Sequence, residues 1–239
     1  MIQIIAHRGA SRYAPENTMS AFLLAHKMGA QHMECDVVLC ADKVPIVMHD
    51  HCLERTTNGN GKVDSVSFSY IQSLDAGSWF SDQFSGIKVL TLKELLIWQR
   101  KMKLYLHLEI KPLDLGSLNR DVDIIMDYVY QYGDSEKIKI LTFQYDILQR
   151  LLLLDDKLPR TLGVRTCDKH SINLAVELGC FQINAHYRYL SKTHIAEVQR
   201  ARMKCGAYTV NTAALLQRLR SFRIDEVYTD DLQIALPEI

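Results

Sequence analysis

The sequence predicts a (β/α)8 barrel. Eight short apolar runs rich in β-branched residues recur along the 239-residue chain, and amphipathic segments of helical period lie between most of them. Outside the interval from 32 to 104, the spacing between successive strand starts suits a repeating unit of one strand, one helix and two loops. We expect a single domain over 1–239 with one core. The predicted strands cover residues 2–7, 32–39, 104–110, 137–142, 160–165, 181–185, 204–210 and 226–229.

The segments between the strands carry helix signals. Residues 15–28 begin with a proline, place Met19, Phe22 and Leu23 on one face and stop at Gly29. Residues 91–102 open with a Thr-Leu-Lys-Glu capping box, and 145–154 and 190–201 have a similar pattern. A doubly wound open sheet is the alternative. It usually has fewer strands, and it carries a glycine-rich turn after the first strand, where this chain has His-Arg-Gly.

The long interval after the second strand predicts a hairpin and an insertion. Residues 36–40 run into a turn at 41–43, and 44–48 return. Antiparallel pairing about that turn would bring His49 near Asp36. The polar segment at about 50–88 is too long for an ordinary loop, so we expect a functional insertion at the carboxyl face, where barrel enzymes keep their sites.

Composition narrows the function classes. The 28 basic and 28 acidic residues give a formal net charge of zero, so no bulk field recruits nucleic acid or an anionic membrane. No apolar run approaches the length of a transmembrane helix, and the first residues lack a signal-peptide pattern. The six cysteines are scattered without a CxxC pair. We expect a cytoplasmic enzyme that is not inserted in a membrane; its oligomeric state is left open.

Acids stand at two-residue spacing on two predicted strands. Residues i and i+2 share a face of a strand, so Glu34 projects with Asp36, and Glu109 projects with Lys111. Such a cluster is costly as a core, although each acid alone would be read as a surface group or as a partner of a nearby basic residue. Three carboxylates without Cys or His ligands favour a hard cation, Mg²⁺ or Ca²⁺.

Histidines follow two of the strands. His7 and His49 each come directly after an apolar run and can face one another as general base and general acid. The other histidines favour structural roles, except that His51 is ambiguous and His107 shares the strand parity of Glu109.

An ordered set of motifs over nearly the whole chain resembles the glycerophosphodiester phosphodiesterase family. The motifs are His7-Arg8-Gly9, Pro15-Glu16-Asn17-Thr18, Glu34-x-Asp36, His49-Asp50, Arg55-Thr56-Thr57-Asn58-Gly59, Leu108-Glu109-Ile110-Lys111, Thr142-Phe143, Tyr208-Thr209-Val210-Asn211 and Thr229-Asp230.

The resemblance implies a role for each matching residue. Glu34, Asp36 and Glu109 would bind the divalent cation, and His7 and His49 would be the acid–base pair. Arg8 and Lys111 would hold the phosphate, and the insertion would help to cover the glycerol moiety. Tyr208 stands where family members usually have Trp, so it would present a smaller aromatic face to the substrate.

The resemblance therefore predicts metal-dependent hydrolysis of small glycerophosphodiesters to glycerol 3-phosphate and an alcohol. The alcohol group, the choice between Mg²⁺ and Ca²⁺ and the assignment of acid and base stay open, with His7 favoured as base and His49 as acid. Two alternatives are a lysophospholipase-D-like enzyme on the same barrel and a non-catalytic metal- or ligand-binding barrel. The first needs an exposed apolar rim near the insertion, and retention of both histidines and all three acids argues against the second.

Overall fold

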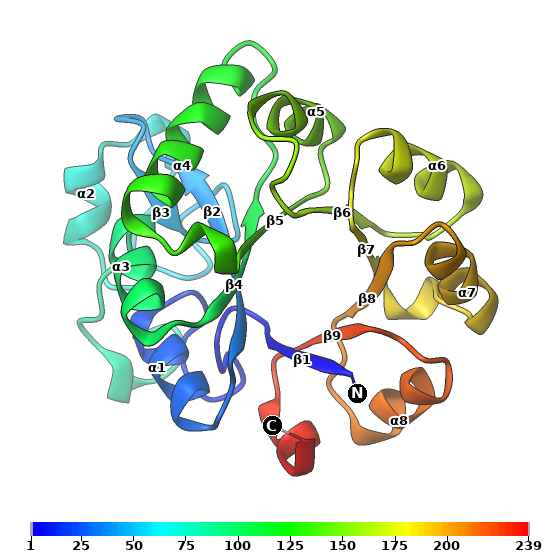
Figure 1. Ribbon diagram of the computed structural model, residues 1–239. Helices are drawn as coiled ribbons and strands as arrows, with labels where there is room; N and C mark the ends of the chain where they lie inside the picture. Colours follow the sequence, from blue (N-terminus) through cyan, green and yellow to red (C-terminus); the bar gives the residue numbers. More distant parts are fainter. Residues whose placement is uncertain (1, 239) are drawn as a thin grey trace.

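The computed structural model describes residues 2–238 and the side chains of residues 2–235. Eight parallel strands form a closed ring in the order β1-β9-β8-β7-β6-β5-β4-β2, and pairing of Ala6 with Met33 joins β2 to β1 (Figure 1). The predicted (β/α)8 barrel is confirmed, and the open sheet is excluded by this closure. The strands of the ring are β1 (Gln3–Ala6), β2 (His32–Leu39), β4 (Tyr105–Ile110), β5 (Ile138–Thr142), β6 (Arg160–Val164), β7 (Gln182–His186), β8 (Lys204–Tyr208) and β9 (Glu226–Thr229).

Helices surround the ring of strands (Figure 1). The main hydrophobic core includes outward-facing strand residues, such as Cys35 and Leu108, and apolar helix faces, such as that of Phe22. None of the helices in residues 2–238 is long and apolar enough to cross a membrane. The helices are α1 (Met19–Lys27), α2 (Phe68–Ser73), α3 (Leu92–Met102), α4 (Leu118–Tyr132), α5 (Tyr145–Leu154), α6 (Lys169–Glu177), α7 (Lys192–Arg200) and α8 (Ala213–Ser221).

The predicted hairpin is present. β3 (Pro45–Val47) pairs antiparallel with the end of β2, with Val37 opposite Val47. The amide of Met48 donates to the carbonyl of Asp36 at 3.1 Å, so the chain leaves the hairpin beside the acid cluster. This pairing carries His49 back to the carboxyl end of β2.

The segment at 50–88 has a small core of its own. It contains α2 and two short 3-10 turns, Val63–Ser65 and Asp82–Phe84. Its Leu53, Ile71 and Leu74 are buried with the outer face of the β2–β3 hairpin in a second hydrophobic cluster. The expectation of a single core is therefore wrong. Polar composition concealed the second cluster because its few apolar residues are scattered between turns.

The first helix is shorter than predicted. The capping box at Thr91 and Glu94 and the 145–154 helix are as expected, but α1 begins at Met19, with Thr18 as its N-cap. Asn17 has φ +58°, and its backbone amide donates to the carbonyl of Arg8 at 3.1 Å. A residue in the left-handed region interrupts a helix, so residues 15–17 form a turn that reaches the site.

The inside of the barrel is polar. Nδ1 of His107 lies 2.7 Å from the hydroxyl of Tyr228 and 3.8 Å from Oε2 of Glu226. Oε2 of Glu226 also accepts from the side-chain amide of Gln182 at 2.8 Å. These groups are buried at positions where many barrels carry branched apolar residues. His107 therefore belongs to the interior of the barrel, with Tyr228 as its partner.

Candidate active site

A cavity of about 760 Å³ opens at the carboxyl ends of the strands. Predicted site residues line it from five elements or their following loops: His7, Arg8, Glu34, His49, Glu109, Lys111 and Tyr208. Asp36 is fully buried beside them, in contact with Arg8 and Lys111. The structure thus brings together residues that are up to 201 positions apart, as His7 and Tyr208 are (208 − 7).

The three acids form one cluster. Single carboxylate oxygens of Glu34, Asp36 and Glu109 lie within 4.8 Å of one another, and all three residues are buried. Strand register causes this, because Asp36 stands opposite Glu109 on the neighbouring parallel strand and Glu34 is two residues away on the same face. Burial and the neighbouring carboxylates raise the pKa values of Glu34 and Glu109.

The cluster fits a hard divalent cation. Its donors are all carboxylate oxygens, as Mg²⁺ and Ca²⁺ prefer. Oε1 of Glu34 is fully buried and has no hydrogen-bond partner among the described residues. An unpaired buried carboxylate oxygen is costly, and a cation bound between the three acids would satisfy it.

Asp36 is the most strongly paired acid of the cluster. Its carboxylate lies 3.1 Å from Nε of Arg8 and 3.3 Å from Nζ of Lys111, and it accepts from the side-chain amide of Asn17 at 2.8 Å. Burial alone would raise the pKa of Asp36, but the two positive charges outweigh burial and lower it. Asp36 therefore stays ionised beside two acids that burial pushes toward neutrality.

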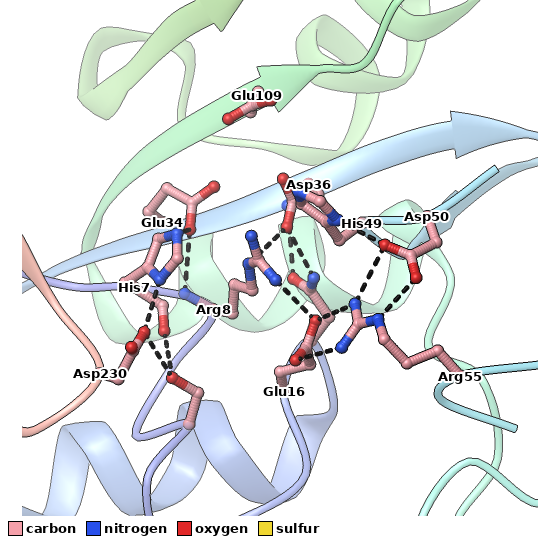
Figure 2. Close-up of polar contacts among 12 residues, drawn as sticks. His7, Arg8, Glu16, Glu34, Asp36, His49, Asp50, Arg55, Glu109 and Asp230 are labelled. Carbon is pink, nitrogen blue, oxygen red and sulfur yellow. Dashed lines mark hydrogen bonds and ion pairs between the residues drawn. The ribbon is translucent and has the colours of Figure 1, made fainter. Parts of the chain in front are cut away.

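The imidazole of His7 is hydrogen-bonded to a carboxylate. Its Nδ1 lies 2.6 Å from Oδ1 of Asp230 (Figure 2). Asp230 is fixed in turn by the side-chain amide of Asn211 at 2.6 Å and by the hydroxyl of Ser11 at 3.2 Å. These donors and His7 outweigh the effect of burial and lower the pKa of Asp230 to about 2. With Nδ1 engaged, Nε2 of His7 is directed to the acid cluster, 3.9 Å from Oε2 of Glu34.

His49 is held in the same way from the other side. Its Nδ1 lies 2.6 Å from Oδ1 of Asp50, the next residue in the chain. Burial and the charges of Arg8 and Lys111 lower the pKa of His49, although Asp36 opposes them. The two imidazoles thus reach the cavity from the loops after β1 and β3, each with a carboxylate on Nδ1 (Figure 2).

Two positively charged side chains, those of Arg8 and Lys111, lie beside the acid cluster. Arg8 has φ +56°, and this backbone lets its amide donate to Oε2 of Glu34 at 2.9 Å while its side chain reaches Glu16 at 2.8 Å. Nζ of Lys111 lies 2.5 Å from Oε1 of Glu109. Both side chains line the cavity, where they can meet an anionic substrate.

Tyr208 forms part of an aromatic wall. Its hydroxyl donates to the carbonyl of Val164 at 2.8 Å, which fixes the ring rather than offering the hydroxyl to the cavity. Phe143 and His186 pack edge-to-face against it, with centroids at 5.7 and 5.6 Å. Burial raises the pKa of Tyr208 to about 12, so it stays neutral.

Some site residues were not singled out from the sequence. Asp230 and Asp50 appeared only inside motifs, yet each holds a histidine. The signal for Asp50 was its adjacency to His49, whereas Asp230 is 223 residues from His7 and nothing local links them. Asn184 and His186 also line the cavity. Asn184 lies within the predicted strand at 181–185, whereas His186 is one residue beyond it and belongs to β7 only in the structure.

Comparisons with known proteins agree with this geometry. A family model described as the glycerophosphoryl diester phosphodiesterase family matches residues 7–234. The chain is 30% identical to a glycerophosphodiester phosphodiesterase of Bacillus subtilis (strain 168), covering 96% of this chain and 83% of the relative. It is 28% identical to a glycerophosphodiester phosphodiesterase of Caldanaerobacter subterraneus subsp. tengcongensis, covering 95% and 93%.

The fold has a similar solved counterpart. An Oleispira antarctica phosphodiesterase, solved with its product sn-glycerol-3-phosphate, superposes with a TM-score of 0.91 at 28% identity, covering 95% of this chain and 92% of that chain. The chain belongs to the glycerophosphoryl diester phosphodiesterase family, and it is an enzyme that hydrolyses glycerophosphodiesters.

Proposed function

We propose that the enzyme uses a divalent cation and two histidines to convert glycerophosphodiesters to glycerol 3-phosphate and an alcohol. The observation that carries the proposal is the pair of carboxylate-held imidazoles, at 2.6 Å each, around one cluster of three acids. Each carboxylate favours the tautomer that keeps the proton on Nδ1 and leaves Nε2 for proton transfer.

Glu34, Asp36 and Glu109 would hold the cation, Mg²⁺ or Ca²⁺. The chemistry that it supplies is polarisation of the phosphoryl oxygens. Arg8 and Lys111 would bind the phosphate from the same side, since both line the cavity next to the acids.

The substrate's glycerol end would lie against Tyr208. The ring is held in the cavity wall by its hydrogen bond to Val164, and it presents an aromatic face without a free hydroxyl. The product bound to the Oleispira antarctica relative, sn-glycerol-3-phosphate, supports a small substrate of this chemistry.

The hydroxyl next to the phosphorylated carbon is the nucleophile in this proposal. His7 accepts its proton at Nε2 while the oxygen bonds to phosphorus. His49 enters this step as the imidazolium and donates its Nε2 proton to the leaving alcohol as that P–O bond breaks. A cyclic phosphate and a free alcohol result. Water then attacks phosphorus and His49 accepts its proton, while the P–O bond formed in the first step breaks and His7 returns a proton to that oxygen, which gives glycerol 3-phosphate. A tethered nucleophile avoids the entropy of capturing a free water.

Turnover of glycerophosphocholine with and without a chelator tests the cation. A 2-deoxy analogue tests the nucleophile, because it should bind but turn over very slowly. His7→Ala and His49→Ala should each lower the rate at least ~100-fold. Full activity in excess chelator would exclude the metal assignment. Normal turnover of the deoxy analogue would instead support direct attack by water.

A lysophospholipase-D-like activity is the second candidate. The loops that carry Pro112 and Phe143 into the cavity wall are tied together, since the Gln144 side chain bonds both the amide and the carbonyl of Leu113, at 2.7 and 3.1 Å. Leu115 in the first of these loops and Tyr145 at the start of α5 are exposed, with 69% and 45% of their surface accessible. An acyl chain could rest there. Lysophosphatidylcholine, assayed beside glycerophosphocholine, separates the two substrates.

We also propose a cytoplasmic location. All six cysteines are free, and five of them are buried, as expected for a chain that folds in a reducing compartment. Fractionation of the producing cell checks it.

A further inference from the structure

One side chain of the 50–88 segment spans two acids next to the site. The guanidinium of Arg55 lies between Asp50 and Glu16 (Figure 2). Its Nε donates to Oδ2 of Asp50 at 2.5 Å and its Nη2 to Oδ1 at 3.1 Å. On the other side, Nη1 and Nη2 donate to the two oxygens of Glu16 at 2.9 and 2.8 Å. Arg55 therefore binds both carboxylates in bidentate fashion.

Each of these acids contacts a predicted site residue. Oδ1 of Asp50 lies 2.6 Å from Nδ1 of His49. Oε1 of Glu16 accepts from Nη1 of Arg8 at 2.8 Å, and Nε of Arg8 lies 3.1 Å from Asp36. A continuous series of contacts thus runs from the imidazole of His49 through Arg55 to the guanidinium of Arg8, the proposed phosphate-binding group.

The planar shape of the Arg55 guanidinium suits this position. It donates four hydrogen bonds to two carboxylates, one on each of two edges of the plane. A lysine ammonium cannot reproduce that geometry. Hydrogen bonding to Arg55 is also the largest cause of the low pKa of Asp50, which keeps that group an acceptor for the histidine.

We propose that Arg55 is a positioning residue for the reaction: through Asp50 it orients the general-acid histidine, and through Glu16 it orients Arg8 toward the phosphate. The inference rests on the proposed function of His49 and Arg8. Among the described residues, Arg55 itself does not line the cavity, and its ion pairs are with Asp50 and Glu16 and not with the three acids of the cluster. It acts by fixing the two carboxylates relative to one another.

Two substrates with the same glycerol end separate this role from a structural one. Glycerophosphocholine has a poor leaving group that needs a proton, whereas the p-nitrophenyl ester of glycerol phosphate leaves without one. Opening of the cyclic phosphate also uses His49, so the rate of alcohol release is measured in single turnovers. Arg55→Gln should slow release of choline from glycerophosphocholine by ~10- to 100-fold and release of p-nitrophenol by less than about 3-fold. KM should rise on both substrates, since both depend on Arg8.

Matched variants complete the design. Arg150 on α5 makes a similar bidentate pair with Asp123 on α4, away from the cavity, so Arg150→Gln should leave kcat and KM unchanged. Arg55→Lys keeps the charge but not the planar set of donors, and it should recover little of the lost rate of choline release. Asp50→Asn should slow choline release to a similar extent, and adding Arg55→Gln to it should cost little more.

Glu16→Gln should reproduce mainly the KM defect. Circular dichroism and thermal midpoints of all variants establish that they are folded. Equal slowing of alcohol release from both substrates in a folded Arg55→Gln enzyme would overturn the inference, and so would additive losses with Asp50→Asn. Failure of the proposed function is seen separately, as an unaltered enzyme that does not turn over glycerophosphocholine.

Discussion

Lys139 on β5 and Glu226 on β9 form an ion pair through the middle of the barrel, with Nζ 2.7 Å from Oε1. In the closed ring each strand is four positions from the other in both directions, so the two residues lie on opposite sides. Glu226 is almost fully buried. The pair therefore joins strands that share no backbone hydrogen bonds.

Removal of one partner should be costly. Lys139→Met leaves a buried carboxylate with less compensation, and we expect the free energy of unfolding to fall by about 3 to 5 kcal/mol. The double variant Lys139→Met/Glu226→Gln should recover part of the loss, since no uncompensated charge remains. Urea unfolding followed by circular dichroism measures both. Equal stability of the Lys139 variant and the unaltered protein would contradict the prediction.

Acid should weaken the fold through the same interior groups. Burial lowers the pKa of His107 to about 3, and His107 and Lys139 together outweigh burial to hold the pKa of Glu226 at about 2. Both pKa values lie below those of the unfolded chain, which therefore binds more protons. Stability should fall as the pH drops from about 6.5 toward 3 for His107, and from about 4.5 toward 2 for Glu226. Urea midpoints measured from pH 7 to 3 test this, and Glu226→Gln should lack the lower part of the dependence.

Glu109→Gln keeps the shape of the acid cluster but removes one of its three charges. We expect weaker Mg²⁺ or Ca²⁺ binding by calorimetry and a loss of rate of at least ~100-fold, with an unchanged circular dichroism spectrum. The variant also leaves Lys111 with one carboxylate partner fewer. An unaltered affinity for both cations would exclude Glu109 as a ligand.

Arg160 at the start of β6 is 2% exposed and caps two helix ends. Its guanidinium donates to the carbonyls of Asp155 and Asp156 after α5, and to those of Leu178 and Gly179 after α6, at 2.7 to 3.3 Å. Arg160→Met should cost about 3 kcal/mol, because four carbonyls at the two helix ends lose their charged donor. Thermal unfolding measures this.

Arg150→Met, which removes a bidentate pair between α4 and α5 instead, should change the unfolding midpoint little. If the two methionine variants lost the same stability, the capping role of Arg160 would be refuted.

Gly163 leaves room for an aromatic wall residue. A Cβ built on it would lie 2.6 Å from the ring of Phe143. Gly163→Ala should therefore displace that ring, cost about 1 to 3 kcal/mol of stability and raise KM. The double variant Gly163→Ala/Phe143→Leu, with a smaller side chain, should regain stability but not KM. Steady-state kinetics and thermal unfolding of both variants check these outcomes.

The acid cluster could be predicted because it depends on local periodicity. A spacing of two places Glu34 with Asp36 and Glu109 with Lys111, and the parallel register of β2 and β4 then joins the two pairs. The hairpin that returns His49 was equally local. The partner of His7 could not be predicted in this way, because Asp230 comes from the other end of the chain.

The interior network was missed for a different reason. Lys139 and Glu226 stand in short strands, where charged residues usually face water. Their burial becomes favourable only when the ring closes and brings opposite strands within hydrogen-bond reach. Pro15 is a good first helical residue and predicts a helix over 15–17, but in the fold the side chain of Asn17 hydrogen-bonds Asp36 instead.

The active site lies beside the seam between β1 and β2, where the ring of strands has the least backbone pairing. Ala6 opposite Met33 is the pair that closes it, whereas β2 and β4 are in register from His32 to Val37. Beyond that pair, the backbone amide of Arg8 bonds a side chain, Oε2 of Glu34, in place of a strand carbonyl. Partial opening of native proteins starts where few backbone bonds must break. Amide exchange should therefore be fastest along this seam, and mild denaturant should abolish turnover before the helices melt.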